Sequence, residues 1–324
     1  MSAIDPVHGL GSGSTPIAAL RARGGRRRDH GGLAFTVLAG FAALLIVAMV
    51  AVILGDVVWN GAHTVTWEFI AGVPREGMTK GGIFPAIYGT LLLVVLMVIA
   101  LVPFGVGAAI WLHLYARQDS WFTRTVRFAV HNLAGVPSIV YGLFGLGFFI
   151  QFIGHQTDRF LGLDVVWGQP ALLWAALTLA LLNLPVVIVT TEEALGTVPR
   201  DQREASLALG ATRWQTVKHV LLPQALPGIL TGAILAVARG AGEVAPILFT
   251  GAAYYLPFLP KAPTDQFMEL GYHVFVLATQ SPDVDATRPL LYGTVLVLLA
   301  LTFLLNLTAI LLRAHLRARL LGRG

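Results

Sequence analysis

Long apolar runs alternate with short polar segments along most of the chain. Several of these runs carry no charged residue and reach the roughly 20 residues that an α-helix needs to cross a bilayer. The pattern therefore predicts an all-α, polytopic membrane protein with six transmembrane helices. The expected spans are residues 33–55, 83–115, 132–154, 171–191, 226–250 and 290–312.

The composition supports this assignment. Of the 324 residues, 56% are hydrophobic and 12% are charged, with a mean hydropathy of +0.74, so most of the chain cannot face water. The absence of cysteine excludes disulfides and thiolate metal sites. Because the histidines also lack the spacing of metal ligands, we expect no metal site.

Basic residues gather in alternate loops. With six spans, 16 Lys and Arg residues lie on one side of the membrane and 5 on the other. The positive-inside rule then places both termini and the loop 204–223 in the cytoplasm. The net charge of +5 reflects this orientation rather than a nucleic-acid site. The sixteen are Arg21, Arg23, Arg26, Arg27, Arg28, Arg117, Arg124, Arg127, Arg200, Arg203, Arg213, Lys218, Arg313, Arg317, Arg319 and Arg323.

The segments outside the spans give the domain organisation. The first 20 residues are rich in Gly, Ser and Pro without periodicity, which predicts disorder. The apolar run after the arginine cluster is too long for a signal peptide, so we expect an uncleaved first span. The predicted parts are a disordered basic N-terminal tail (1–32), a membrane domain (33–313) with a cytoplasmic loop (192–224), and a basic C-terminal tail (314–324).

The cytoplasmic loop carries signals for two short helices. Asp201 with Glu204, and Thr212 with Gln215, resemble capping boxes. Gly210 lies between them, where a helix end often needs a left-handed residue. We expect the second helix to end at Pro223 and to carry an apolar stripe made of Trp214, Val217, Val220 and Leu221.

We expect this apolar stripe to be shielded from water, and the residues alone leave open three ways in which this happens. It packs on the membrane domain of its own chain, lies among lipid headgroups as a basic amphipathic segment, or docks on a partner protein.

The spacing in this loop resembles a known motif. Glu204-Ala205, Gly210 and Val220-x-Leu222-Pro223 fit the EAA signature of ABC-importer permeases, with Ser206 and Val220 as mild departures. The resemblance implies a type I ABC-importer architecture, in which this loop forms coupling helices that dock on a separate ATP-hydrolysing subunit. The residues that we expect to form the ATPase-coupling loop in this EAA region are Glu204, Ala205, Gly210, Ala211, Thr212 and Arg213.

The chain itself has no phosphate-binding loop for ATP. A Walker A motif needs Gly-Lys-Ser/Thr, and Lys80, Lys218 and Lys261 each follow a residue other than glycine. We therefore expect no catalytic residue and no bound cofactor in this chain, with ATP and Mg used by a partner ATPase.

A charged pair lies in the fifth expected span. Arg239 and Glu243 are four residues apart and would share a helix face, although a charge at mid-bilayer costs about 2.5–3.5 kcal/mol on insertion scales. The guanidinium fork suits phosphate or carboxylate, and Glu243 would neutralise it in an empty path. Gly240 and Gly242 leave room for a helix or a solute, and Pro246 permits a kink. The pair either fixes helix packing or belongs to a substrate pathway.

Further stretches resemble the phosphate-specific ABC permeases, the PstA-type subunit in particular, over about residues 33–313. This resemblance implies a permease that imports inorganic phosphate across the bacterial cytoplasmic (inner) membrane, with Arg239 and Glu243 on the substrate pathway. It also implies a paralogous PstC-type permease, two PstB-type ATP-binding subunits and an extracytoplasmic PstS-type phosphate-binding protein as partners. The matching segments are 81–85, 136–145, 184–195, 238–246, 265–268 and 278–282.

Other readings stay open on physical grounds. Another tetrahedral oxyanion would suit the arginine as well as phosphate does. A secondary anion transporter would need pseudo-repeated broken helices, and a membrane enzyme would need a convergent acid/base or metal set; neither pattern is seen.

Three features have two interpretations each. Glu192 and Glu193 form a solvated helix end or a gate. The glycines at 142, 145 and 147 pack helices or line the pathway. The loop 251–289 either covers the outer mouth and meets a binding protein, or is a solvated surface.

Overall fold

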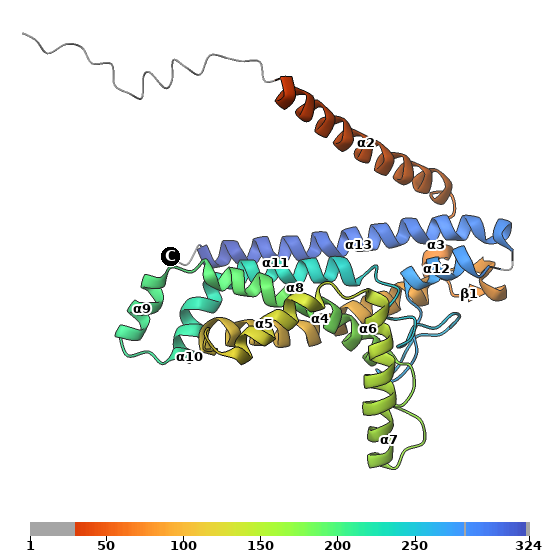
Figure 1. Ribbon diagram of the computed structural model, residues 1–324. Coiled ribbons are helices and arrows are strands. Elements are labelled where there is room, and N and C mark those ends of the chain that lie inside the picture. The colour runs from red at the N-terminus through yellow and green to blue at the C-terminus, as the bar shows by residue number, and fades with distance from the viewer. Residues whose placement is uncertain (1–29, 282, 322–324) are drawn as a thin grey trace, which may run out of the picture. The chain divides into compact units, whose positions relative to one another are not determined.

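The computed structural model describes residues 30–281 and 283–321. Six of the described helices are long and apolar enough to cross a membrane, as expected, and the fold is all-α apart from one small hairpin (Figure 1). Of the N-terminal tail expected at residues 1–32, residues 1–29 lie outside the described part of the chain. The spans are Gly31–Gly61, Phe84–Tyr115, Ser138–Leu161, Leu172–Gly196, Arg213–Gly240 and Val284–Ala318.

The chain divides into two compact units, residues 1–56 and 57–324. The described part of the first unit is helical and belongs to α2 (His30–Gly61). Its residues from Gly31 to Asp56 are all exposed, and they are apolar around the whole helix. Such a helix requires lipid or another helix around it rather than water.

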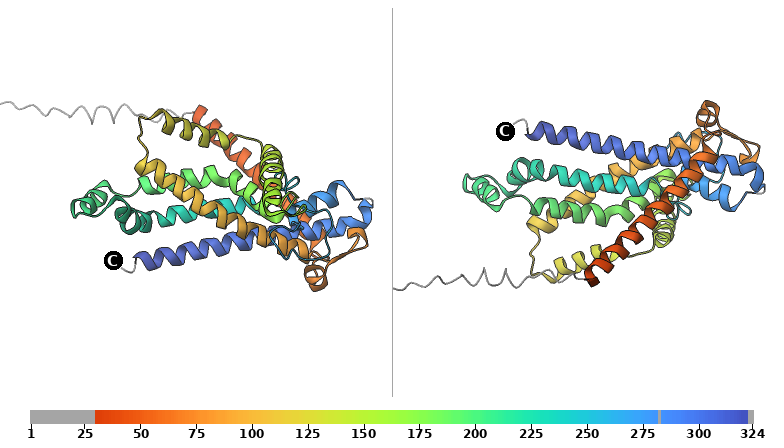
Figure 2. Two further views of the ribbon diagram at one scale, coloured as in Figure 1. Left: turned by 90° about the horizontal axis from the view of Figure 1, so that it is seen from below. Right: turned by 90° about the horizontal axis from the view of Figure 1, so that it is seen from above.

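The second unit is a helical bundle whose spans are joined by short helices (Figure 2). A two-stranded antiparallel hairpin precedes the first long helix of this unit, with Pro74 paired to Gly81. The elements of this unit after α2 are α3 (Trp67–Ala71), β1 (Pro74–Arg75), η1 (Glu76–Met78), β2 (Lys80–Gly81), α4 (Phe84–Ile110), η2 (Trp111–Tyr115), α5 (Trp121–Leu133), α6 (Ser138–Phe144), η3 (Gly145–Gly154), α7 (His155–Leu161), α8 (Leu172–Gly196), α9 (Arg200–Ala208), α10 (Arg213–Thr216), η4 (Val217–Leu221), α11 (Leu222–Gly240), α12 (Leu270–Thr279) and α13 (Val284–Leu321).

Helix α8 is the most buried span and packs against both α4 and α11. Small residues make these contacts close. A Cβ added at Gly105 of α4 would lie 2.7 Å from Val187 Cγ1, and one at Gly232 of α11 would overlap the Thr190 hydroxyl. Close backbone approach of this kind is how helices gain packing energy where lipid removes the hydrophobic driving force between them.

The third span begins later than predicted. Residues 121–133 form the separate helix α5, and the span starts at Ser138, directly after Pro137. A proline disfavours the α conformation in the residue before it, and accordingly α5 ends at Leu133 and Val136 lies outside the helices. The apolar pattern alone did not reveal this break.

The fifth span begins earlier than predicted, because Pro223 does not stop the helix. The helix runs from Arg213 through the π-helical turn η4 and into α11 without interruption. Pro223 lies in the first turn of α11, where a missing N–H is tolerated, and the wider π turn before it absorbs the irregularity.

The same span also ends earlier than predicted. Helix α11 stops at Gly240, and residues 241–251 form a series of turns. Two glycines in three residues lower the helix propensity, and Pro246 would leave a carbonyl of a continued helix without its donor. Glu243 therefore lies outside the helix that carries Arg239.

The two ends of this bundle hold different elements. Helices α9 and α10 lie at one end, where α13 also finishes, whereas the hairpin and α12 lie at the other (Figures 1 and 2). The basic C-terminal tail expected at 314–324 continues α13 as helix to Leu321. The structure thus makes α11 a direct connection between the two ends.

The contact between α8 and α11 gives a stability prediction. Gly232→Ala forces a methyl group against Thr190, whose hydroxyl already donates to Val186 O at 2.8 Å. We expect it to lower the apparent melting temperature, since overpacking costs about 1–3 kcal/mol.

Gly107→Ala in α4 is the matched control, because a Cβ there meets no atom within 4 Å. This variant should be neutral or stabilising, as alanine is the better helix former by about 1 kcal/mol. Equal melting temperatures for the two purified variants would contradict the packing described.

Candidate functional site

The loop between α8 and α11 folds as two helices around Gly210, as predicted. Gly210 has φ +84°, and its N–H donates to Leu207 O at 3.0 Å. The N–H of Ala211 donates to Ser206 O at 3.2 Å. This pair of bonds is a Schellman motif, which ends α9 and reverses the chain into α10.

Only one of the two predicted capping boxes is present. Thr212 Oγ1 accepts from Gln215 N at 3.2 Å, and Gln215 Oε1 accepts from Thr212 N at 2.7 Å. The box expected for Asp201 and Glu204 is wrong, because α9 starts at Arg200 behind Pro199 and has no side-chain cap. Asp201 is thus already inside the helix, where its charge favours the first turn.

The apolar surface of this loop is divided. Val217 and Leu221 are buried in a cluster with α8, so part of the predicted stripe packs on its own chain. The other part remains open, with Leu209 89% and Trp214 58% exposed. Helix α9 has no buried residue at all. Of the residues that match the EAA region, Ala211 is half-buried and the others are exposed.

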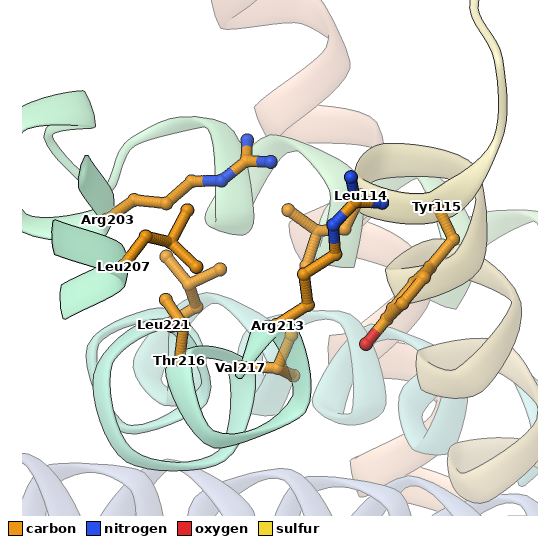
Figure 3. A pocket seen from close by; sticks show the side chains of 8 residues that line it. All are labelled: Leu114, Tyr115, Arg203, Leu207, Arg213, Thr216, Val217 and Leu221. Atoms are coloured by element: carbon orange, nitrogen blue, oxygen red, sulfur yellow. The ribbon is translucent and has the colours of Figure 1, made fainter. Parts of the chain in front are cut away.

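Basic side chains lie around a crevice between this loop and η2 (Figure 3). Arg203 of α9 and Arg213 of α10 lie on opposite sides of it, above an apolar floor that includes Leu207 and Val217. Neither guanidinium forms an ion pair within the part of the chain that the structure describes. An adjoining recess of about 670 Å³ adds Arg200 to this basic surface.

An ion pair that sequence reasoning missed joins α5 to α8. Arg127 contacts both carboxylate oxygens of Glu192 at 3.0 Å and also donates to Leu112 O at 3.1 Å. The Glu192 side chain is 16% exposed, so it is not the solvated helix end that we weighed, whereas Glu193 is exposed. The pair lies 65 positions apart in the sequence, and no local pattern marks it.

At the other end of α11, Arg239 and Glu243 form the expected pair. Arg239 Nε donates to Glu243 Oε1 at 3.0 Å, and the two side chains are 43% and 20% exposed. The prediction that they share a helix face is wrong, because Glu243 lies in the turns after Gly240. The Arg239 Nη atoms have no hydrogen-bond partner among the described residues. The fork of the guanidinium therefore remains available.

The glycines around this pair have different surroundings. A Cβ at Gly240 would lie 2.6 Å from Met97 Sδ of α4, whereas one at Gly242 would meet nothing within 4 Å. At Gly142 a Cβ would lie 3.0 Å from two backbone carbonyls of residues 245 and 246, and Gly145 abuts Thr178. Gly240, Gly142 and Gly145 thus serve packing, and Gly242 faces open space beside Glu243.

Helix α12 supports the turn that carries Glu243. Gly271 approaches Val244, since a Cβ there would lie 3.0 Å from Val244 Cγ2. Glu269 caps α12 by accepting from Tyr272 N at 2.6 Å, and Thr90 of α4 accepts from Leu270 N at 3.0 Å. The loop expected at 251–289 is therefore partly helical, and the sequence did not predict that Glu269 is a buried helix cap.

Comparisons with known proteins agree with this arrangement. Residues 101–322 match the family model described as binding-protein-dependent transport system inner membrane component. The probable ABC transporter permease protein YqgI of Bacillus subtilis (strain 168) is 33% identical over 264 residues, which are 78% of this chain and 85% of that protein. Phosphate transport system permease protein PstA 1 of Mycobacterium tuberculosis (strain CDC 1551 / Oshkosh) is 36% identical over 230 residues, 69% of each chain.

Solved structures show the same fold. A bacterial alginate ABC transporter, in complex with its alginate-bound periplasmic protein, matches with a TM-score of 0.60 over 86% of this chain and 93% of that chain. The sequences are 14% identical, so this likeness concerns the fold alone.

Burial of Glu269 predicts a pH effect on stability. Burial raises the pKa of Glu269 to about 7, against 4.5 for a free glutamate. Folding therefore takes up a proton between these pH values, and the free energy of unfolding falls as the pH rises through this window, by roughly 3 kcal/mol. Glu269→Gln stays neutral, so its melting temperature should exceed that of the wild type above pH 7 and match it near pH 4.5.

Comparing the wild type with Glu269→Gln separates the pH effect of Glu269 from that of its neighbour His273. Burial lowers the pKa of His273 to about 4, so that histidine destabilises the fold as the pH falls, in both proteins alike. A difference in melting temperature that does not change with pH would contradict the assignment.

Proposed function

This chain belongs to the family of inner-membrane components of binding-protein-dependent transport systems, and we propose that within it the chain is the permease subunit for inorganic phosphate. As a member of the family it is a multi-pass inner-membrane protein and the permease subunit of an ABC importer, not itself an ATPase. Importer permeases of this kind work with ATPase subunits and a periplasmic binding protein.

The open fork of Arg239 is the observation that carries the phosphate proposal. The four N–H groups of its Nη atoms have no acceptor among the described residues, and their planar arrangement matches an oxyanion in a bidentate contact. Gly242 leaves the neighbouring space free. The relatives whose names include phosphate transport support this choice of anion over others.

The surroundings of Arg239 favour brief binding. Glu243 already accepts from Nε, so an arriving anion shares the guanidinium with a carboxylate that repels it. The C-terminal end of α11 adds a partial negative charge. A transport path needs sites that an ion enters and leaves readily, and this competition provides one.

We propose that the opposite end of α11 receives the ATPase. The exposed Leu209 and Trp214 offer apolar surface to a partner. Arg203 and Arg213, which form no ion pair with the described residues, add basic surface. Because α10, η4 and α11 form one helix that ends at Gly240, displacement of the loop moves the segment that carries Arg239. The basic residues assign this loop to the cytoplasm.

The proposed complex follows from these two ends. It contains this PstA-type chain, a PstC-type paralogue, two PstB-type ATPases that use ATP and Mg, and a PstS-type phosphate-binding protein. The phosphate-loaded binding protein would meet the end of the bundle that holds α12.

Loss of the guanidinium tests the substrate site. Arg239→Gln in the complex should lower phosphate uptake by roughly tenfold or more, because a hydrogen bond to a charged group contributes about 1.5–3 kcal/mol. Uptake of radiolabelled phosphate by cells measures it, and co-purification of the partner subunits shows that the complex assembles.

Arg159→Gln removes the same charge from an exposed position of α7 and should leave uptake unchanged. Normal uptake by an assembled Arg239→Gln complex would remove Arg239 from the pathway.

The backbone at Gly210 tests the coupling loop. A Cβ at Gly210 would meet nothing within 4 Å, so the constraint is its positive φ and not space. Gly210→Val opposes that conformation by roughly 1–2 kcal/mol, whereas asparagine adopts it more readily. We expect Gly210→Val to raise the ATP hydrolysed per phosphate imported and Gly210→Asn to change it little. The same ratio in both variants would show that the loop geometry does not serve coupling.

A further inference from the structure

Helices α11 and α13 run side by side towards the end of the bundle that holds the coupling loop (Figure 2). A groove of about 650 Å³ lies between them at that end. Its walls come from the end of α8 and the start of α11 and consist mainly of small or apolar residues. Two arginines of α13, Arg313 and Arg317, form the remaining side. The small and apolar wall residues are Ala194, Pro223, Ala225, Pro227 and Gly228.

The two arginines leave the groove positively charged. Arg313 Nη1 donates to Thr231 Oγ1 of α11 at 2.8 Å, which holds its guanidinium across the groove. Arg317 follows one turn later and is exposed. No acidic residue lines the groove, and neither arginine forms an ion pair within residues 30–281 and 283–321.

The groove lies at the end of the apolar part of α13, where we expect the hydrocarbon of a bilayer to meet the headgroups. Helix α13 exposes Leu304, Leu307 and Leu311 in the turns before the arginines, as a lipid-facing helix does. The arginines then follow directly after this apolar stretch, where basic side chains reach the interface. The distribution of basic residues assigns this interface to the cytoplasmic leaflet, whose anionic lipids attract such side chains.

We propose that this groove binds one anionic phospholipid of the inner membrane. Its phosphodiester lies between Arg313 and Arg317, and an acyl chain follows the wall formed by Ala225 and Gly228. The apolar wall suits a chain that free phosphate lacks, and the paired charges select an anionic headgroup over a zwitterionic one. The lipid would contact both α13 and the helix that joins the coupling loop to Arg239, so its presence affects the movement of that helix. This site does not depend on which solute is transported.

Native mass spectrometry of the assembled complex tests the site. The complex is equilibrated in nanodiscs of phosphatidylglycerol or of phosphatidylcholine, and the retained lipid is then counted. We expect the wild type to retain phosphatidylglycerol selectively, and Arg313→Gln/Arg317→Gln to lose it roughly tenfold or more. Arg313→Lys/Arg317→Lys keeps the charges and should retain most of it, and Arg288→Gln, at the other end of α13, should behave as wild type.

Three results would overturn the proposal. Equal retention of phosphatidylglycerol by the wild type and the double glutamine variant would place the lipid elsewhere. Its displacement by excess inorganic phosphate would show that the arginines bind a free anion. A photo-crosslinking residue placed at the exposed Gln224, beside the groove, should capture lipid, and capture of a partner subunit instead would show that protein covers the groove.

Discussion

The close approach of α8 to α4 and α11 is the constraint on which the rest of the bundle depends. In a membrane, helices associate through packing and not through exclusion of water, so the distance between backbones decides the energy gained. Gly105 and Gly232 bring the neighbouring helices onto α8 at positions where any side chain would overlap it. With α11 held in this way, its two ends keep a defined separation.

That arrangement places two chemically different surfaces at opposite ends of one helix. The end near Gly210 is exposed, basic and partly apolar, as a surface that receives a partner should be. The other end carries the Arg239 guanidinium, whose Nη atoms meet no acceptor in the described part of the chain, and Glu269 and Thr90 fix the neighbouring α12. Arg127 and Glu192 tie α5 to the same central helix, so the coupling end is braced from a second direction.

Local signals in the sequence predicted what depends on local physics. The number of spans follows from hydropathy, and Gly210 and Thr212 were identified because caps and left-handed turns need particular residues. The helix ends around Pro223 and Gly240 were predicted wrongly. Two features there depend on the surrounding packing. One is the π turn that accommodates Pro223, and the other is the set of turns that brings Glu243 back to Arg239. The pair between Arg127 and Glu192 depends on the tertiary fold entirely, and so no sequence period marks it.

Transport by the complete complex tests the central claim most directly. The complex of this chain with its partner subunits is reconstituted in proteoliposomes, and uptake of radiolabelled phosphate is followed with the binding protein outside and ATP at the ATPase face. The account predicts uptake that requires ATP and that unlabelled phosphate or arsenate suppresses, while sulfate does not. Uptake without ATP, or equal suppression by sulfate, would contradict it.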